Sequence, residues 1–500
     1  MSEIIRSLLV VLFIALITFH FARTPFVNVG ISPKNFDIRR NAWFGVTLAL
    51  FLANNFWLFL IISAIIFIYG LKKDLNPFAF AMALLFAAPL IQSQVSGFGV
   101  VNYLVDLNYF RIIAVFILLP LTLQLRKEKG AIRFGSTTPE KLLIAYLALG
   151  LFRQILVDST TNTLRTFLYD VTDVILPYYV ASRYFKTIES IRDAMASFVL
   201  AAAIMGLIGG FEFFKGWLLY SNIPGALGTE WGLGGYLMRG ANLRATATTG
   251  QAIVLGYAMV VALGFYLFVS RSIVSKKLAL LGLGALLIGL LAPLSRGPWM
   301  GALLLAIVYI GTGPDAGRNL AKSVFIALLV FLVALVTPYG ATIIDHLPFI
   351  GTLEAANVTY RERLFTNSMT VIMRNFWFGS YDFMSTPEML ELKFTYDGGI
   401  IDLVNSYIAI ALSGGITALA AFTSFFGWIG VKLFAAIKNK PPQHAELHQL
   451  QRALIATLTA ILFMITAASS IALVPIIYWI VAGFCMATLR LSVTNEQIHA

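Results

Sequence analysis

Long apolar runs limit what this chain can fold into. Five of them span residues 193–214, 249–270, 278–294, 323–338 and 471–489. Each is long enough, or nearly so, to cross a hydrocarbon core of roughly 30 Å. With 59% hydrophobic and 12% charged residues and a mean hydropathy of +0.83, the chain is not an ordinary soluble protein. The runs do not alternate as barrel strands do. We therefore predict an all-α, polytopic membrane helical bundle.

We predict about 12 to 14 membrane helices in total. The apolar segments that predict them are 5–22, 43–70, 78–92, 109–125, 140–157, 164–183, 193–214, 249–270, 278–294, 298–313, 323–338, 405–434, 453–470 and 471–489. Within this set, Asn54 and Asn55 interrupt the segment 43–70 and could divide it into two short helices. The first segment is interpreted as a retained membrane span, because no small-residue cleavage site follows it.

The charges of the connecting loops predict the orientation. The loops 126–141, 271–277 and 432–452 have more basic than acidic residues, whereas 339–404 has four basic and eight acidic residues. Assigning the basic loops to the cytoplasm gives a consistent alternation from residue 78 onward. The same alternation places the basic segment 23–41 outside, as an exception to the rule.

The net charge of +12 does not indicate a nucleic-acid partner, since the basic residues are dispersed over short loops. Cys485 is the only cysteine, which excludes an internal disulfide and a cysteine metal site. No cluster of metal-ligand residues stands out in the outer loops, so we expect neither a metal nor a cofactor.

The chain divides into N-terminal membrane helices (1–338), one large outer loop (339–404) and C-terminal membrane helices (405–500). So long a polar segment in a compact membrane chain is usually functional. Its middle, 360–376, has the periodicity of an amphipathic helix, with Phe365, Met369, Ile372, Met373 and Phe376 on one face. Arg361 shares that face, from which it could point toward the membrane helices.

Arg244, Arg296, Arg361 and Arg363 lie at or near the ends of apolar segments, and the predicted topology puts them all on the non-cytoplasmic side. Charges near a membrane often mark a site or a partner. A group of guanidinium side chains favours an anionic ligand, phosphate above all. Taken singly, each arginine has an ordinary alternative: an interfacial arginine beside a capped helix, a snorkelling arginine in a turn, or an ion-paired surface.

Several short motifs follow one another in a recognisable order. They are Leu243–Gly250, Ser295–Gly297, Arg361 or Arg363 at the start of a helix, Arg374–Gly379, Val404–Tyr407 and Ser413–Ile416. In this order they resemble the bacterial O-antigen ligase and Wzy-type polysaccharide polymerase superfamily. The resemblance covers about residues 240–420, and the number of helices and the large late loop agree with it.

The resemblance implies a metal-independent glycosyltransferase of the bacterial inner membrane, with a GT-C-like helical fold and a large periplasmic loop. Its donor would be an oligosaccharide linked to undecaprenyl diphosphate, and a flippase and a chain-length regulator would be possible partners beside the membrane lipids. Arg244 and Arg296 match the family's arginines best. Arg361 and Arg363 compete for a third position, and Arg239 could assist, although a solvated arginine is the simpler interpretation.

Two departures favour a polymerase of repeat units over a ligase. Ligases of the family have a histidine where this chain has Val404. The residues that follow the first arginine also match the family's pattern only in part. The only histidine of the outer loop, His346, is interpreted as an ordinary loop histidine. A ligase that transfers glycan to lipid A core or protein remains the alternative. A flippase is the second alternative, but it would require cations along a path between the leaflets.

A general base, if one is used, has three candidates. Asp402 and Asp397 lie just before the helix predicted at 405–434, where a carboxylate can equally serve the helix start. Glu212, near the outer end of the 193–214 helix, is the third. Asn405, in the Val404–Tyr407 motif, is a candidate for substrate binding.

Overall fold

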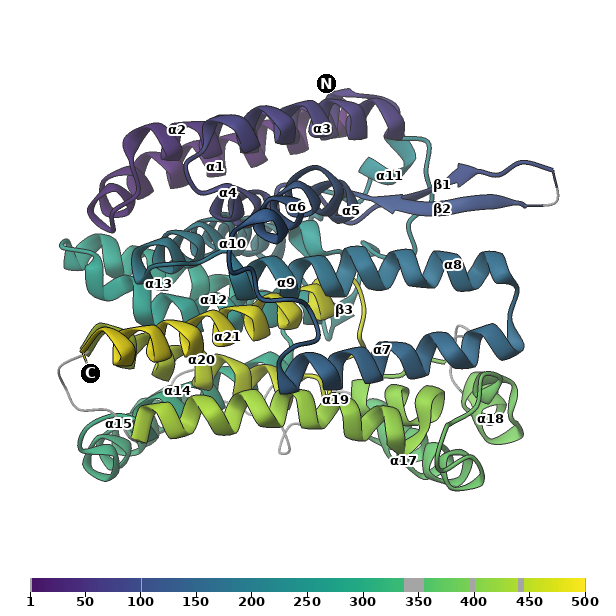
Figure 1. The fold of residues 1–500 in the computed structure, drawn as a ribbon. Helices are drawn as coiled ribbons and strands as arrows, with labels where there is room; N and C mark the ends of the chain where they lie inside the picture. Colours follow the sequence, from purple (N-terminus) through teal and green to yellow (C-terminus); the bar gives the residue numbers. More distant parts are fainter. Residues whose placement is uncertain (1, 100, 337–354, 396–400, 439–444, 500) are drawn as a thin grey trace.

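The computed structural model describes residues 2–99, 101–336, 355–395, 401–438 and 445–499. Most of these residues are helical, and the long helices lie side by side in one bundle (Figure 1). Within the described ranges, eight helices are long and apolar enough to cross a membrane: Glu3–Asn28, Phe56–Lys73, Tyr109–Lys127, Ile188–Lys215, Ala252–Ser272, Ser406–Lys438, Glu446–Met464 and Leu473–Ser492. The chain is therefore a multi-pass α-helical membrane protein, as predicted.

The N-terminal elements are α1 (Glu3–Asn28), α2 (Pro33–Leu52), α3 (Phe56–Lys73), α4 (Pro77–Leu84), β1 (Gln92–Ser96), β2 (Tyr103–Asn108), α5 (Tyr109–Ile113), η1 (Ala114–Leu118), α6 (Leu119–Lys127), α7 (Thr138–Val157), α8 (Thr160–Tyr169), η2 (Asp170–Ile175), α9 (Leu176–Arg183) and α10 (Ile188–Lys215).

The later elements are α11 (Ile223–Ala226), β3 (Met238–Arg239), β4 (Asn242–Leu243), η3 (Ala247–Thr249), α12 (Ala252–Val269), η4 (Ser270–Ser272), α13 (Lys276–Leu291), α14 (Arg296–Gly311), α15 (Ala316–Val336), α17 (Ala355–Arg374), η5 (Phe383–Ser385), α18 (Pro387–Thr395), α19 (Ser406–Lys438), α20 (Ala445–Met464) and α21 (Leu473–His499).

The predicted segment 43–70 is two helices, and the break falls at the two asparagines. Asn54 has a positive φ of 50°, a conformation that asparagine tolerates better than most residues. Asn55 caps α3, because its side chain accepts hydrogen bonds from the backbone N–H groups of Trp57 and Leu58. The chain therefore reverses at Ala53–Asn55, and α2 and α3 pack against each other as an antiparallel pair.

This reversal removes the exception to the positive-inside rule. The buried side chain of Arg39 on α2 makes ion pairs with Asp74 (2.8 Å), after α3, and with Asp193, near the start of α10. Segment 23–41 thus lies at the same end of the bundle as the loops predicted to be cytoplasmic. The exception arose because 43–70 was counted as one helix, whereas the chain makes two at the asparagines that the sequence had marked as a possible break.

The bundle has two ends of different character. The basic end has the connections 74–76, 128–137, 184–187, 270–275 and 312–315, and the ion pairs Lys186–Glu128 and Arg183–Glu140 join some of them. The long-loop end has the connections 53–55, 158–159, 216–251 and 292–295, the β1–β2 hairpin, and α17 and α18 (Figure 1).

The all-α class is confirmed, and the described residues add two short β-hairpins that the sequence did not predict. The helix expected at 78–92 ends at Leu84, and β1 follows it, paired antiparallel with β2 from Gln92↔Asn108 onward. Arg165 on α8 holds this hairpin through the carbonyls of Tyr103 and Leu104, with its guanidinium 3.6 Å from the centre of the Tyr103 ring. The second pair, β3–β4, is only two residues long in each strand.

Helix α10 lies at the centre of the bundle and packs against α4, α12 and α13. Small residues allow the close approach: a Cβ on Gly206 would lie 2.3 Å from the Ala285 carbonyl oxygen, and one on Gly289 would lie 2.4 Å from the Gly206 Cα. Membrane helices pack closely where small residues face one another. This contact brings the end of α10 next to the turn between α13 and α14, where the candidate site begins.

Candidate functional site

The first half of the site is the turn Ala292–Ser295, between α13 and α14 at the long-loop end. The β3–β4 hairpin is fastened to it, since the Ala245 N–H donates to the Ala292 carbonyl (3.2 Å). Arg244 Nε donates to the Pro293 carbonyl (3.1 Å), and Arg244 Nη2 donates to Ser295 Oγ (2.8 Å). Arg296 is the first residue of α14. The two arginines that the family resemblance selects therefore flank the same turn.

Arg239 joins the same turn. Its Nη1 donates to the carbonyl of Leu294, a residue with a positive φ of 49°, and the side chain is buried at 7% exposure. The interpretation of Arg239 as a solvated arginine was wrong. The hairpin turns the chain back over two residues, so that Arg239 in β3 and Arg244, directly after β4, both reach the turn.

Glu212 has a different role from the one expected. It is fully buried, and its carboxylate accepts hydrogen bonds from the backbone N–H groups of Leu219 (3.0 Å), Thr246 (3.0 Å) and Ala247 (2.8 Å). These contacts fix both ends of the 216–248 segment to α10. A carboxylate so enclosed cannot meet an acceptor hydroxyl. The expectation that Glu212 binds substrate or acts as a base was therefore wrong, and Glu212 instead supports the arginine hairpin.

The second half of the site is the connection after α20, residues 465–470. Arg361 on α17 donates from Nη2 to the Ala467 carbonyl (3.4 Å), and the Asp402 carboxylate accepts a hydrogen bond from Ser469 Oγ (2.7 Å). The two halves are adjacent, because a Cβ on Gly297 in α14 would lie 3.7 Å from the Ala467 Cβ. Arg244, Arg296, Arg361 and Asp402 are thus gathered around two neighbouring turns.

Tyr360 sets the position of Asp402. Its hydroxyl donates to the Asp402 carbonyl and accepts from the Asp402 N–H, both at 2.9 Å. The Asp402 side chain itself is exposed. Sequence reasoning missed Tyr360 and Ser469, because a tyrosine beside an arginine motif and a serine in a small-residue turn carry no signal of their own.

The remaining candidate residues differ in their surroundings. Arg363 is exposed, and within the described ranges no hydrogen bond or ion pair of its side chain is found. Asn405 caps α19, with Oδ1 accepting from the N–H groups of Tyr407 (2.9 Å) and Ile408 (3.2 Å), so that oxygen already has a structural role. Asp397 and His346 lie outside the described residues.

The amphipathic helix is present as α17, but its buried face is not the predicted one. Tyr360, Leu364, Val371 and Ile372 pack with residues of α18 and the start of α19. Of the predicted stripe, only Ile372 is buried. The others are exposed: Phe365, Met369, Met373 and Phe376. The prediction failed because α17 packs beside other elements of the outer segment, which the apolar pattern alone does not reveal.

Two of the family-like motifs bind each other. Helix α19 is broken at Gly415 (φ 68°, ψ −173°), and the segment Phe376–Ser380 occupies the break. The Ser380 N–H donates to the Leu412 carbonyl, and the Ile416 N–H donates to the Phe376 carbonyl, both at 2.8 Å. Backbone groups freed inside a membrane helix need such partners. This docking fixes the chain directly after α17, the helix that carries Arg361.

Among the described residues, no group of three or more His, Cys, Asp or Glu side chains could hold a metal ion. Arg239, Arg244, Arg296 and Arg361 all have interaction partners in the chain. No protein-family model and no curated protein matches the sequence.

Proposed function

We propose that this protein is a membrane glycosyltransferase that polymerises polysaccharide repeat units from an undecaprenyl-diphosphate-linked donor. The long-loop end would face the periplasm, the bundle would be of the GT-C type with about 12 to 14 spans, and the membrane would be the bacterial inner membrane. The observation that supports this proposal is the gathering of Arg244, Arg296, Arg361 and Asp402 around two adjacent turns at one end of the bundle.

The chemistry follows from the leaving group. An acceptor hydroxyl attacks the anomeric carbon of the donor glycan, and the bond between that carbon and the diphosphate oxygen breaks. The diphosphate leaves with the bonding electrons and remains on its carrier lipid. Guanidinium groups suit this charge, because their planar forks donate two hydrogen bonds to one phosphate. Since the arginines already have partners in the chain, the diphosphate would add to these contacts or replace them.

The acceptor proton needs a destination, and Asp402 is the best placed of the described carboxylates. One of its oxygens accepts from Ser469, and Tyr360 holds its backbone on both sides. A carboxylate of fixed position can accept a proton from a hydroxyl within hydrogen-bond reach. Arginine alone can neutralise the diphosphate, so we propose a reaction that needs no metal ion, and activity should persist in chelator.

A polymerase is favoured over a ligase because Val404 stands where the ligases have a histidine. The second alternative, a flippase, is less well supported. Buried Arg39 and Arg183 lie at the basic end with carboxylate partners, and Arg239 lies at the long-loop end, so these cations do not mark a path between the leaflets.

The test uses purified protein and lipid-linked repeat units. Arg244→Ala and Arg296→Ala should each lower the rate of polymer formation by roughly 100-fold or more, the range for losing one donor to a developing anion. Lysine at either position should restore little, because an ammonium group lacks the fork. Arg361→Ala should also lower the rate of polymer formation. Arg363→Ala, on the same helix, is the matched control and should retain activity.

Unchanged polymer length from Arg296→Ala would contradict the proposal, as would a strict need for Mg²⁺ or Mn²⁺. The deletion strain separates the alternatives. Without a polymerase, single repeat units remain on the carrier. Without a ligase, long polymer accumulates there. Without a flippase, repeat units stay on the cytoplasmic side.

A further inference from the structure

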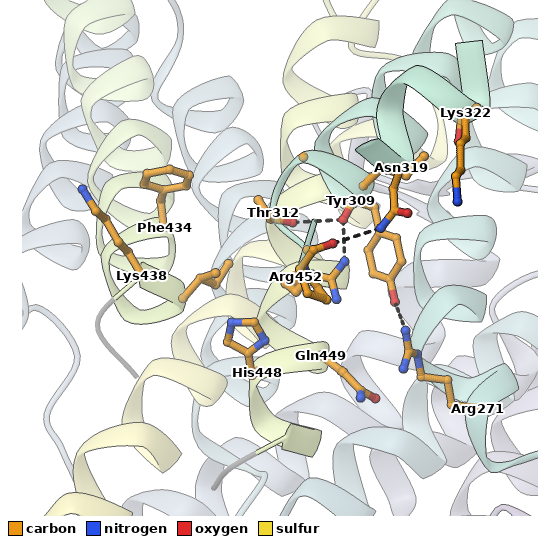
Figure 2. A pocket seen from close by; sticks show the side chains of 16 residues that line it. Arg271, Tyr309, Thr312, Asn319, Lys322, Phe434, Lys438, His448, Gln449 and Arg452 are labelled. Carbon is orange, nitrogen blue, oxygen red and sulfur yellow. Dashed lines mark hydrogen bonds between the residues drawn. The ribbon is translucent and has the colours of Figure 1, made fainter. Parts of the chain in front are cut away.

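A second concentration of basic residues lies at the basic end of the bundle, far from the arginines of the proposed reaction. It lines a cavity of about 950 Å³ between the end of α14, the start of α15, the end of α19 and the start of α20 (Figure 2). Its basic residues are Arg271, Lys322, Lys438, His448 and Arg452. None of the described residues that line this cavity is acidic.

Arg452 is the buried member of this set, at 7% exposure. Its Nη2 donates to the Tyr309 carbonyl (2.7 Å), its guanidinium carbon lies 4.5 Å from the centre of the Tyr309 ring, and its Nε has no hydrogen-bond partner. Gly313 leaves room for the group, since a Cβ there would lie 2.3 Å from Nη2. The end of the α14 dipole offsets part of the charge. One carbonyl for five donors still leaves this cation short of acceptors.

Two carboxylates on the neighbouring elements already have cationic partners. Asp315, in the turn before α15, pairs with Arg318 (2.7 Å), and Glu446 at the start of α20 pairs with Arg192. Arg271 contributes a neutral contact, with Nη2 donating to the Tyr309 hydroxyl (3.1 Å), which directs this side chain toward the same ring as Arg452 (Figure 2). The positive charge of the cavity is therefore not balanced by the described residues around it.

Apolar side chains also line the cavity. Phe434 and Ile437 contribute from α19 and Ile310 from α14, and Phe434 is 54% exposed. In a membrane such side chains contact acyl chains. A charged cavity with an apolar margin at the end of a membrane bundle has the chemistry that recognises lipid headgroups.

We propose that this cavity binds an anionic phosphate group, which the buried Arg452 and the exposed side chains of Lys322 and Lys438 contact. The phosphate belongs either to the headgroup of an anionic lipid in the leaflet at the basic end or to a soluble phosphate compound. The site is separate from the proposed glycosyl transfer and stands or fails independently of it.

The experiment measures lipid binding to the purified full-length protein by native mass spectrometry. Phosphatidylglycerol is titrated against phosphatidylcholine, which has no net charge, and inorganic phosphate and pyrophosphate form the soluble arm. The variant is Lys322→Gln/Lys438→Gln, which changes two exposed side chains and should leave the fold intact. The control is Lys432→Gln, on the same helix α19 but outside the cavity, with its ammonium 5.7 Å from the Trp428 ring.

We expect phosphatidylglycerol to bind more tightly than phosphatidylcholine, and the double variant to bind it roughly 30-fold more weakly, the effect of two lysines near a charged headgroup. The control should bind as the unaltered protein does. Phosphatidylglycerol binding that millimolar phosphate does not displace supports a lipid ligand. Binding of phosphate or pyrophosphate that the double variant loses, without lipid binding, supports a soluble ligand. Equal binding of both lipids with no phosphate binding, or equal affinities of the double variant and the control, would overturn the proposal.

Discussion

Replacing Gly415 by alanine tests whether the broken helix α19 and the segment Phe376–Ser380 hold each other. Gly415 has φ 68° and ψ −173°, a backbone region that is essentially restricted to glycine. A Cβ at this position would lie 2.3 Å from the Trp377 carbonyl oxygen, and a Cβ on Gly379 would lie 2.5 Å from the Leu412 carbonyl oxygen. Both obstacles are backbone atoms, so neither clash can be relieved by a side-chain rotation.

The magnitude follows from what the variant must give up. Keeping the docked geometry costs about 1–3 kcal/mol of backbone strain, in addition to the clash. Releasing the segment instead loses the hydrogen bonds Ser380–Leu412, Ile416–Phe376 and Thr417–Trp377, at about 1 kcal/mol each. Once the segment is released, α19 can form continuous helical hydrogen bonds across residue 415. Release therefore costs less free energy than keeping the docked geometry. We expect the docked state to lose about 3 kcal/mol, which is roughly a 100-fold change in its equilibrium.

Hydrogen exchange of the detergent-solubilised protein measures this directly. Amide protection in the peptide that covers 376–380 should fall by roughly 100-fold in Gly415→Ala, and Gly379→Ala should behave alike. Gly427→Ala is the matched control on the same helix. Its Cβ would meet no atom within 4 Å, and alanine there should stabilise the helix by about 0.5–1 kcal/mol. Wild-type protection in Gly415→Ala would refute the argument that the two motifs depend on each other.

Three further outcomes are expected. A reporter fused at Lys276 should be cytoplasmic and one at Glu388 periplasmic, and a cytoplasmic signal at Glu388 would remove the proposed site from the periplasm. Glu212→Gln keeps one acceptor oxygen, so at least one of the three buried N–H groups loses its acceptor and the variant should lose about 1–3 kcal/mol of stability, while the folded protein keeps most activity. Glu212→Leu should lose about 3 kcal/mol or more, because all three N–H groups lose their acceptor. A fully folded but inactive Gln variant would restore Glu212 as a reacting group. The hydrogen bond from Tyr381, with those from Asn162 and Ser159, lowers the pKa of Asp158 to about 2, and the bond to Asp158 raises the pKa of Tyr381. The contact should therefore be complete between about pH 4 and pH 10, and it should weaken as the pH falls toward 2 and also above 10. Hydrogen exchange of Tyr381→Phe should show a smaller acid transition, because the hydrogen bonds from Asn162 and Ser159 to Asp158 remain.

The arginines of the candidate site could be found from the sequence because their location is a local property. Arg244 and Arg296 each lie at the end of an apolar run, and loop charge places both ends on one side of the membrane. The role of Glu212 could not be found in this way. Its proximity to a helix end suggested a reacting group, and only the folded 216–248 segment shows that three backbone N–H groups enclose it.

The helical membrane class was determined by the sequence itself, because the length of an apolar run decides whether it can cross a membrane without any tertiary contact. The tertiary structure decided that residues 33–73 form two helices, since the reversal at Ala53–Asn55 depends on an asparagine cap and on the hydrogen bond from Phe56 to Leu227, far along the chain. It also decided which face of α17 is buried and why two distant glycine motifs belong together. Those features arise from contacts between segments that are remote in sequence, and such contacts leave no periodic pattern within either segment.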